Sequence, residues 1–115
     1  MEKSSAGSAR TSNYQVKNIA PVMAGSDMRA RLFTLAPGDV IPWHYHRESA
    51  DQYFILQGEL TVSTRPPEET RTVGLGGNYR IAPGKSHLIT NRSAIDCQFL
   101  LLQGVGALDW VKAED

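Results

Sequence analysis

Two histidines separated by a single residue, His44 and His46, constrain this chain more than any other feature. They lie in the stretch GDVIPWHYHRESADQYFILQG, from Gly38 to Gly58, which is rich in β-forming residues. Alternate side chains of an extended strand point to the same face, so both imidazoles should face the same way. The third histidine, His87, lies in a second block with Gly and Pro at its turns. A fold that joins the two blocks would bring every histidine of the chain together.

The strand-like segments of the chain are short and are separated by turn residues. They cover residues 14–20, 28–36, 41–46, 51–57, 60–64, 71–75, 79–81, 87–90 and 97–103. No segment has sustained helical periodicity. Many short strands with regularly spaced turns predict an all-β sandwich or barrel.

The length of 115 residues suits one domain. We place this domain at 14–115 and expect residues 1–13, which are small and polar, to form a flexible arm. In the C-terminal tail, Trp110 is expected to dock on the body of the domain.

The composition argues against several classes of partner. Twelve basic and twelve acidic residues leave no net charge, so neither nucleic acid nor an anionic membrane is indicated. No apolar run reaches the roughly 18–20 residues that span a bilayer, and the N-terminus lacks the apolar stretch of a signal peptide. The single cysteine, Cys97, excludes an internal disulfide. It suits a buried core position and a reducing compartment, and we expect a cytoplasmic protein.

The two blocks resemble the two sequence motifs of the cupin family. The first matches as Gly38, five residues, His44-Tyr45-His46, four residues, Asp51, six residues and Gly58. The second matches as Gly76, five residues, Ala82-Pro83-Gly84-Lys85-Ser86-His87, three residues and Asn91, with its proline displaced by one position. The resemblance covers residues 29 to 102. It implies an antiparallel double-stranded β-helix (jelly-roll) barrel of the cupin type.

The same resemblance implies one divalent transition metal inside the barrel. Its ligands are carried over as His44, His46, Asp51 and His87. Three imidazoles and a carboxylate suit Fe, Mn, Ni, Co, Cu or Zn. The alternative is an empty pocket of hydrogen-bonded histidines, as in degenerate members of the family.

Asp51 stands where the family usually has glutamate, which has a longer side chain. Asp51 could bind the metal directly, bind it through water, or leave it to three histidines. Glu48 and Gln52 are minor alternatives, although Glu48 falls in a loop and Gln52 has the wrong strand parity. Because a metal-binding histidine needs its second nitrogen held by a partner, we expect the histidines to be better preorganised than the carboxylate. Asp51→Ala should then weaken metal binding far less than His46→Ala.

Four further residues are candidates for a substrate pocket: Arg29, Arg31, Tyr53 and Tyr79. If the strand at 28–36 turns Phe33 inward, the two arginines point inward as well and can clamp a carboxylate or enolate. The alternative is a bulge that sends both arginines to solvent, because a buried unpaired arginine is costly. Each tyrosine is also a suitable core residue if its hydroxyl has a partner.

These features favour a small metalloenzyme. The expected chemistry is a dioxygenase-like oxidation or cleavage of a small organic acid, diketone or phenol at an open metal position. Two alternatives use the same barrel: a Mn- or Zn-dependent Lewis-acid isomerase or hydrolase, and a non-catalytic module that binds or senses a small ligand. A fold alone does not decide among them.

The strands at 41–46 and 51–57 also predict a homodimer. Regular alternation places Ile41, Trp43 and Tyr45 on the outer face of one strand, and Phe54 and Leu56 on the other. A contiguous patch of such side chains exceeds what monomers usually expose. A two-fold dimer is the commonest way to bury one.

Overall fold

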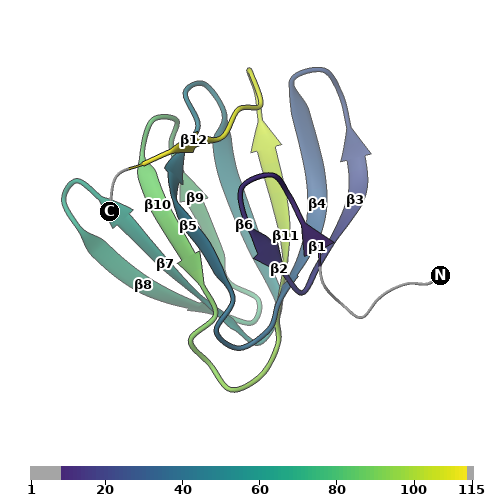
Figure 1. The fold of residues 1–115 in the computed structure, drawn as a ribbon, viewed down its shortest axis with the longest axis vertical. Coiled ribbons are helices and arrows are strands. Elements are labelled where there is room, and N and C mark those ends of the chain that lie inside the picture. The colour runs from purple at the N-terminus through teal and green to yellow at the C-terminus, as the bar shows by residue number, and fades with distance from the viewer. Residues whose placement is uncertain (1–8, 114–115) are drawn as a thin grey trace.

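The computed structural model describes residues 9–113, which form two five-stranded antiparallel sheets packed together (Figure 1). One sheet contains, in spatial order, β12 (Val111–Lys112), β5 (Val40–Tyr45), β10 (Ser86–Thr90), β7 (Glu59–Arg65) and β8 (Glu69–Gly74). The other contains β3 (Asn18–Ala24), β4 (Met28–Leu35), β11 (Cys97–Gly104), β6 (Ala50–Gln57) and β9 (Asn78–Ile81). The described residues include no helix, and hence none that could cross a membrane. The expected all-β, double-stranded β-helix fold is confirmed.

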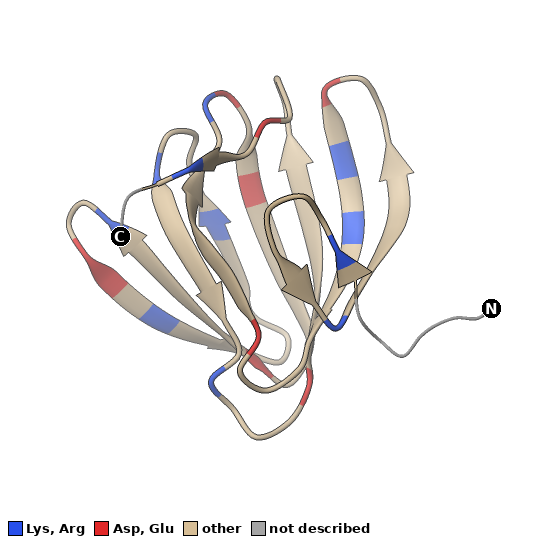
Figure 2. Ribbon diagram, viewed as in Figure 1, with Lys and Arg blue, Asp and Glu red and all other residues tan. Residues whose placement is uncertain are grey.

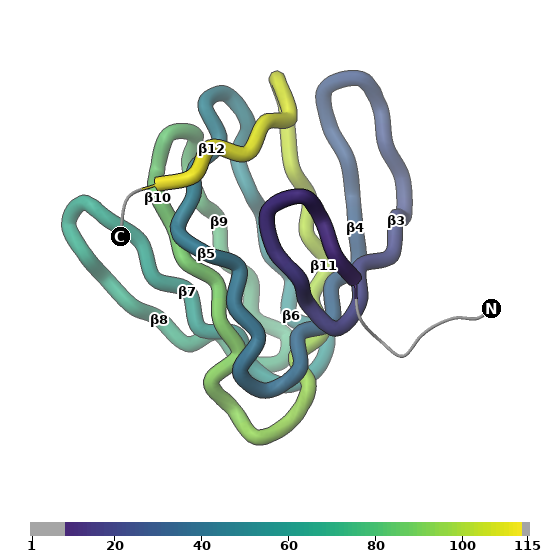
Figure 3. The backbone as a smooth tube through the Cα atoms, in the orientation of Figure 1, coloured from purple at the N-terminus to yellow at the C-terminus, as the bar shows by residue number. Residues whose placement is uncertain are grey.

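A small hairpin precedes the two sheets. Its strands, β1 (Ala9–Arg10) and β2 (Gln15–Val16), pair with each other, and β2 lies against β5. Figure 3 shows this hairpin as the dark purple loop in front of the space between β5 and β4. Ordered structure therefore begins before position 14, and the part of the expected arm at 1–8 lies outside the described residues. The first expected strand, 14–20, is divided between β2 and β3.

The second sheet sorts its inward-facing residues by polarity along the strands. Cross-strand register places Phe33 of β4 beside Phe99 of β11, and Phe99 beside Ile55 of β6. The two phenylalanine rings are stacked with centroids 5.1 Å apart. Toward the other end of the same strands, Gln103 lies between Arg29 and Asp51. One end of the interior is therefore an apolar core and the other end is polar.

The first sheet repeats this arrangement. Ile89 of β10 pairs with Ile41 of β5, and two residues earlier His87 pairs with His44. Between these pairs β5 has one residue more than β10, which is a β-bulge. The bulge includes Pro42, which has no N–H for a ladder hydrogen bond.

This bulge corrects the expected outer face of β5. Ile41 is only 4% exposed and belongs to the core, because the extra residue changes the alternation between Ile41 and His44. Trp43 does lie on the face of β5 that points away from His44, as expected. There the guanidinium of Arg65 covers the Trp43 ring, 3.8 Å from its centroid.

The contiguous apolar patch predicted across β5 and β6 does not exist, because the two strands belong to different sheets. An apolar outer face is instead present on the sheet that contains β6. There Leu100 lies between Leu32 of β4 and Phe54 of β6, and Phe54 and Leu56 are 36% and 49% exposed.

Candidate metal centre

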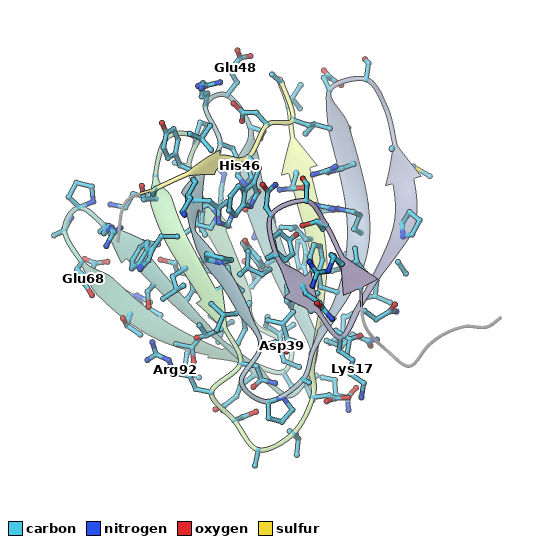
Figure 4. The ribbon with its side chains drawn as sticks, viewed as in Figure 1. Lys17, Asp39, His46, Glu48, Glu68 and Arg92 are labelled. Carbon is cyan, nitrogen blue, oxygen red and sulfur yellow. The ribbon has the colours of Figure 1, made fainter. Side chains whose placement is uncertain are left out.

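Four side chains from three strands and one loop converge at the polar end of the interior. They are His44 of β5, His46 just after it, Asp51 of β6 and His87 of β10. One ligand atom from each lies within 4.8 Å of the others. All four residues are at most 3% exposed. In Figure 4, His46 lies inside the fold, whereas Glu48 projects outward from the adjoining loop.

Backbone carbonyl groups hold each imidazole by its Nδ1 atom. His44 Nδ1 lies 2.7 Å from the carbonyl of Pro42, and His87 Nδ1 lies 2.9 Å from that of Lys85. His46 Nδ1 contacts the carbonyl of Asp109, in the tail. A carbonyl can only accept, so each Nδ1 carries a proton, and an imidazole that is neutral then has its lone pair on Nε2. Such a partner on the second nitrogen is typical of metal-binding histidine.

Asp51, like the histidines, has hydrogen-bond partners that hold it, although weaker preorganisation was expected for the carboxylate. The Tyr53 hydroxyl donates to Asp51 Oδ2 at 2.9 Å, and Gln103 Nε2 donates to Oδ1 at 3.0 Å. The Gln103 amide is itself oriented, because its Oε1 accepts from Arg29 Nε at 2.9 Å and from Arg31 at 2.8 Å. The carboxylate is therefore preorganised by two donors.

The electrostatics of the cluster favour a charged carboxylate. Burial acts to raise the pKa of Asp51, but hydrogen bonds and charges from His46 and His87 lower it overall. Burial likewise opposes protonation of His46, yet its hydrogen bond to Asp51 and the carboxylate charge raise the pKa of His46. Burial, with the charge of His87, lowers the pKa of His44 to about 3. Burial and the Asp51 charge keep the Tyr53 hydroxyl protonated by raising its pKa.

The chemistry of these donors fits a divalent transition metal. His87 Nε2 and His46 Nε2 lie 3.1 and 3.4 Å from Asp51 Oδ2. Lone pairs this close repel unless a proton or a metal ion lies between them. Adjacent ligands of an ion with bonds of about 2.1 Å are themselves about 3 Å apart. Nitrogen and oxygen donors of this kind suit Fe, Mn, Ni, Co, Cu or Zn.

The other candidate residues differ in position and contacts. Tyr53 is 1% exposed and serves Asp51 directly, whereas Tyr79 is its cross-strand neighbour and packs against the core. Glu48 is exposed, and its Oε1 accepts from the backbone N–H of Ala107 at 3.4 Å. Gln52 bonds Asn78 on the exposed face of the sheet.

Arg29 and Arg31 point inward, not to solvent. Both reach Gln103, and both line a cavity beside the cluster. Figure 2 shows them as two basic bands on β4, in the same sheet as the acidic band of β6. The guanidinium of Arg31 also lies 4.9 Å from the centroid of the Phe33 ring.

Sequence reasoning missed two residues of this centre, Gln103 and Trp110. Gln103 continues the inward alternation of β11 beyond Phe99 and Leu101, so parity alone could have placed it inside. The Trp110 ring stacks on His44 with centroids 4.6 Å apart and planes 15° apart. The expectation that Trp110 docks on the body is confirmed, but no local pattern indicates its place beside the histidines.

The fold and the cluster together define a double-stranded β-helix protein with an interior cluster able to bind a metal ion. The family model described as "Cupin domain" matches residues 31–103. Since this match covers more than half of the chain, the protein belongs to the cupin family, as its two motifs suggested. No curated protein matches the sequence.

Solved structures agree with this assignment. The TT1209 protein of Thermus thermophilus is 26% identical, with a TM-score of 0.70 over 76% of this chain and 82% of its own. An uncharacterised Klebsiella pneumoniae protein with a double-stranded β-helix domain is 18% identical, with a TM-score of 0.75 over 99% and 90%. An oxalate decarboxylase of Lactobacillus farciminis is 15% identical, with a TM-score of 0.73 over 91% of this chain and only 32% of its own. The last two likenesses show the fold alone.

Proposed function

We propose that this cupin is a metal-dependent oxidoreductase that oxidises or cleaves a small organic acid, diketone or phenol with dioxygen. The observation that carries the proposal is the cluster of four buried donors, His44, His46, Asp51 and His87, beside a cavity. Four protein ligands leave positions open on a six-coordinate ion, as a catalytic site requires. The oxalate decarboxylase on the same fold acts on a small organic acid, but that activity belongs to that protein and is no net oxidation.

The residues of the chain have separable roles in this proposal. His44, His46, Asp51 and His87 would hold the ion, which supplies the redox chemistry when bound. Tyr53 and Gln103 orient the carboxylate. Burial of the cluster limits the access of bulk water, which strengthens the interactions inside it.

Metal analysis and oxygen uptake test the proposal. Protein purified without added metal should contain close to one redox-active transition metal per chain. Fe(II)-loaded protein should consume dioxygen with at least one member of a panel of small acids, diketones and phenols. His46→Ala should lose both properties, whereas the exposed control Glu48→Ala should keep them.

Two outcomes would overturn the proposal in favour of its alternatives. Turnover of the panel by Mn- or Zn-loaded protein without dioxygen would indicate a Lewis-acid isomerase or hydrolase. Saturable binding of a panel compound without any turnover would indicate a ligand-binding or sensing module.

We further propose that the chain acts as a homodimer in the cytoplasm. The apolar outer face that includes Leu32, Phe54, Leu100 and Leu102 supports self-association, because a two-fold contact buries the same apolar patch of both subunits at once. A lone, buried Cys97 accords with a reducing compartment. Light scattering should give twice the 12.6 kDa chain mass, and Leu100→Glu should halve it. A monomeric wild-type protein would contradict this proposal.

A further inference from the structure

A cavity of about 230 Å³ adjoins the cluster of candidate metal ligands formed by His44, His46, Asp51 and His87. Its walls are the 11–14 turn of the N-terminal hairpin together with Arg29, Arg31 and Trp110. Trp110 and the two arginines connect this cavity wall to the cluster. Trp110 stacks on His44, and both arginines bond the Gln103 amide that holds Asp51. The cavity therefore borders side chains that contact the cluster directly or through Gln103.

Within the part of the chain that the structure describes, two hydrogen-bond donors of this cavity wall have no partner. The Nε atom of Arg31 and the Nε1 atom of Trp110 are both buried, and neither makes a hydrogen bond to any of residues 9–113. A buried donor without an acceptor costs free energy, so such atoms in a folded protein call for an explanation. Both groups can only donate. A ligand that satisfies them must present acceptor atoms.

The positive charges around the cavity favour a ligand whose acceptor atoms carry negative charge. Arg29 and Arg31 share a single neutral acceptor, Gln103 Oε1, and Tyr14 gives Arg31 a further, uncharged partner. Asp51 is the acidic group whose charge acts on Arg31, and Asp51 belongs to the metal cluster. Two guanidinium charges thus face one carboxylate, and a divalent ion would add to the positive surplus. Burial and the charge of Arg29 lower the pKa of Arg31, as expected for cations confined together.

We propose that this cavity is a carboxylate-binding subsite, in which Arg29, Arg31 and the Trp110 indole N–H hold one end of an organic acid. Guanidinium groups present paired N–H donors that match the two oxygens of a carboxylate. The other end of the acid faces the metal cluster. The subsite selects organic acids over the neutral diketones and phenols that the cluster alone would accept. Only the reaction of the bound acid rests on the proposed function, because the subsite is built from residues outside the ligand set.

Calorimetric titration of zinc-loaded and metal-free protein with small carboxylates tests this subsite. The probes are acetate, isobutyrate and benzoate, each compared with its uncharged primary amide. At least one acid should bind about tenfold or more tightly than its amide, since a hydrogen bond to a charged group contributes about 1.5–3 kcal/mol. Arg29→Gln and Arg31→Gln should each remove that preference when they are compared with the wild type at equal zinc content.

Two further variants separate the subsite from general effects. Trp110→Phe keeps an aromatic ring but removes the N–H, and should weaken acid binding without changing amide binding. Arg71→Gln, an exposed arginine of β8, is the matched control and should behave like the wild type. Thermal unfolding identifies any variant that fails to fold, and the remaining variants of the set then decide.

The outcomes distinguish this proposal from the proposed function. Failure of all three acids to bind zinc-loaded protein better than their amides would overturn the subsite and leave the metal centre intact. Acid preference that survives both arginine variants would also overturn it. Arginine-dependent acid binding by protein that takes up no metal would uphold the subsite and overturn the oxidoreductase.

Discussion

The same strands build both ends of the interior, but burial of side chains has opposite effects on stability at the two ends. β11 contributes Phe99 to the apolar end and Gln103 to the polar end, four residues along one strand. β10 likewise contributes Ile89 to one end and His87 to the other. At the apolar end, burial removes hydrocarbon from water and stabilises the fold. At the polar end, burial is unfavourable unless each charge and donor has a partner.

This contrast indicates where stability and function can be changed independently. The apolar end is close-packed, so its contribution comes from shape and volume. The polar end relies on a hydrogen-bond chain that runs from the arginines through Gln103 to Asp51. Substitutions at the two ends should therefore affect different observables. Five substitutions, taken in decreasing order of expected effect, test this separation.

The largest effect is expected from Phe99→Ala at the apolar end. Phe99 is fully buried between Phe33 and Tyr53, so its loss leaves a cavity that costs about 3–5 kcal/mol in the free energy of unfolding. Denaturant unfolding measures this loss. Below the unfolding transition, the metal affinity of the variant should stay close to that of the wild type. A large fall in the metal affinity of the folded variant would show that the two ends are coupled.

The next effect distinguishes a direct carboxylate ligand from an accessory one. His46→Ala and Asp51→Ala should each lower metal affinity by more than about 100-fold, which exceeds the usual effect of residues that only support ligands. Competition with a chelator of known affinity measures both. Equal losses are expected because Asp51 is held by two donors. An Asp51→Ala protein within about tenfold of wild type would mean that three histidines suffice.

A smaller effect is expected from Tyr53→Phe, which removes only the hydroxyl that donates to Asp51. Metal affinity should fall by about 10- to 100-fold, as for other partners of metal ligands. The same chelator competition measures it. An unchanged affinity would show that Gln103 alone orients the carboxylate.

The smallest effect is expected from Glu48→Ala. This acidic residue is close to the cluster in sequence, but it is exposed and outside the ligand set. Its removal should change the free energy of unfolding by no more than about 0.5 kcal/mol. Metal affinity should remain that of the wild type. A marked loss of bound metal would mean that the loop folds inward to complete the coordination.

Local pattern was sufficient for much of this protein. The common facing of His44 and His46 follows from strand geometry, in which side chains two residues apart share a face. The same alternation places Arg29 and Arg31 on one face with Phe33. Turn residues between short apolar segments indicate the all-β class, because Gly and Pro interrupt strands at predictable places. These properties depend on neighbours along the chain, so they can be derived before any fold is known.

Other properties depend on which strands meet, and they emerge only in the folded chain. β5 and β6 follow each other in sequence but lie in different sheets, so their outer faces form no common patch. The bulge at Pro42 turns Ile41 inward, because β5 has an extra residue opposite β10. Trp110 reaches His44 from the far end of the chain. Such contacts result from long-range pairing and from the packing of the tail, which no local periodicity encodes.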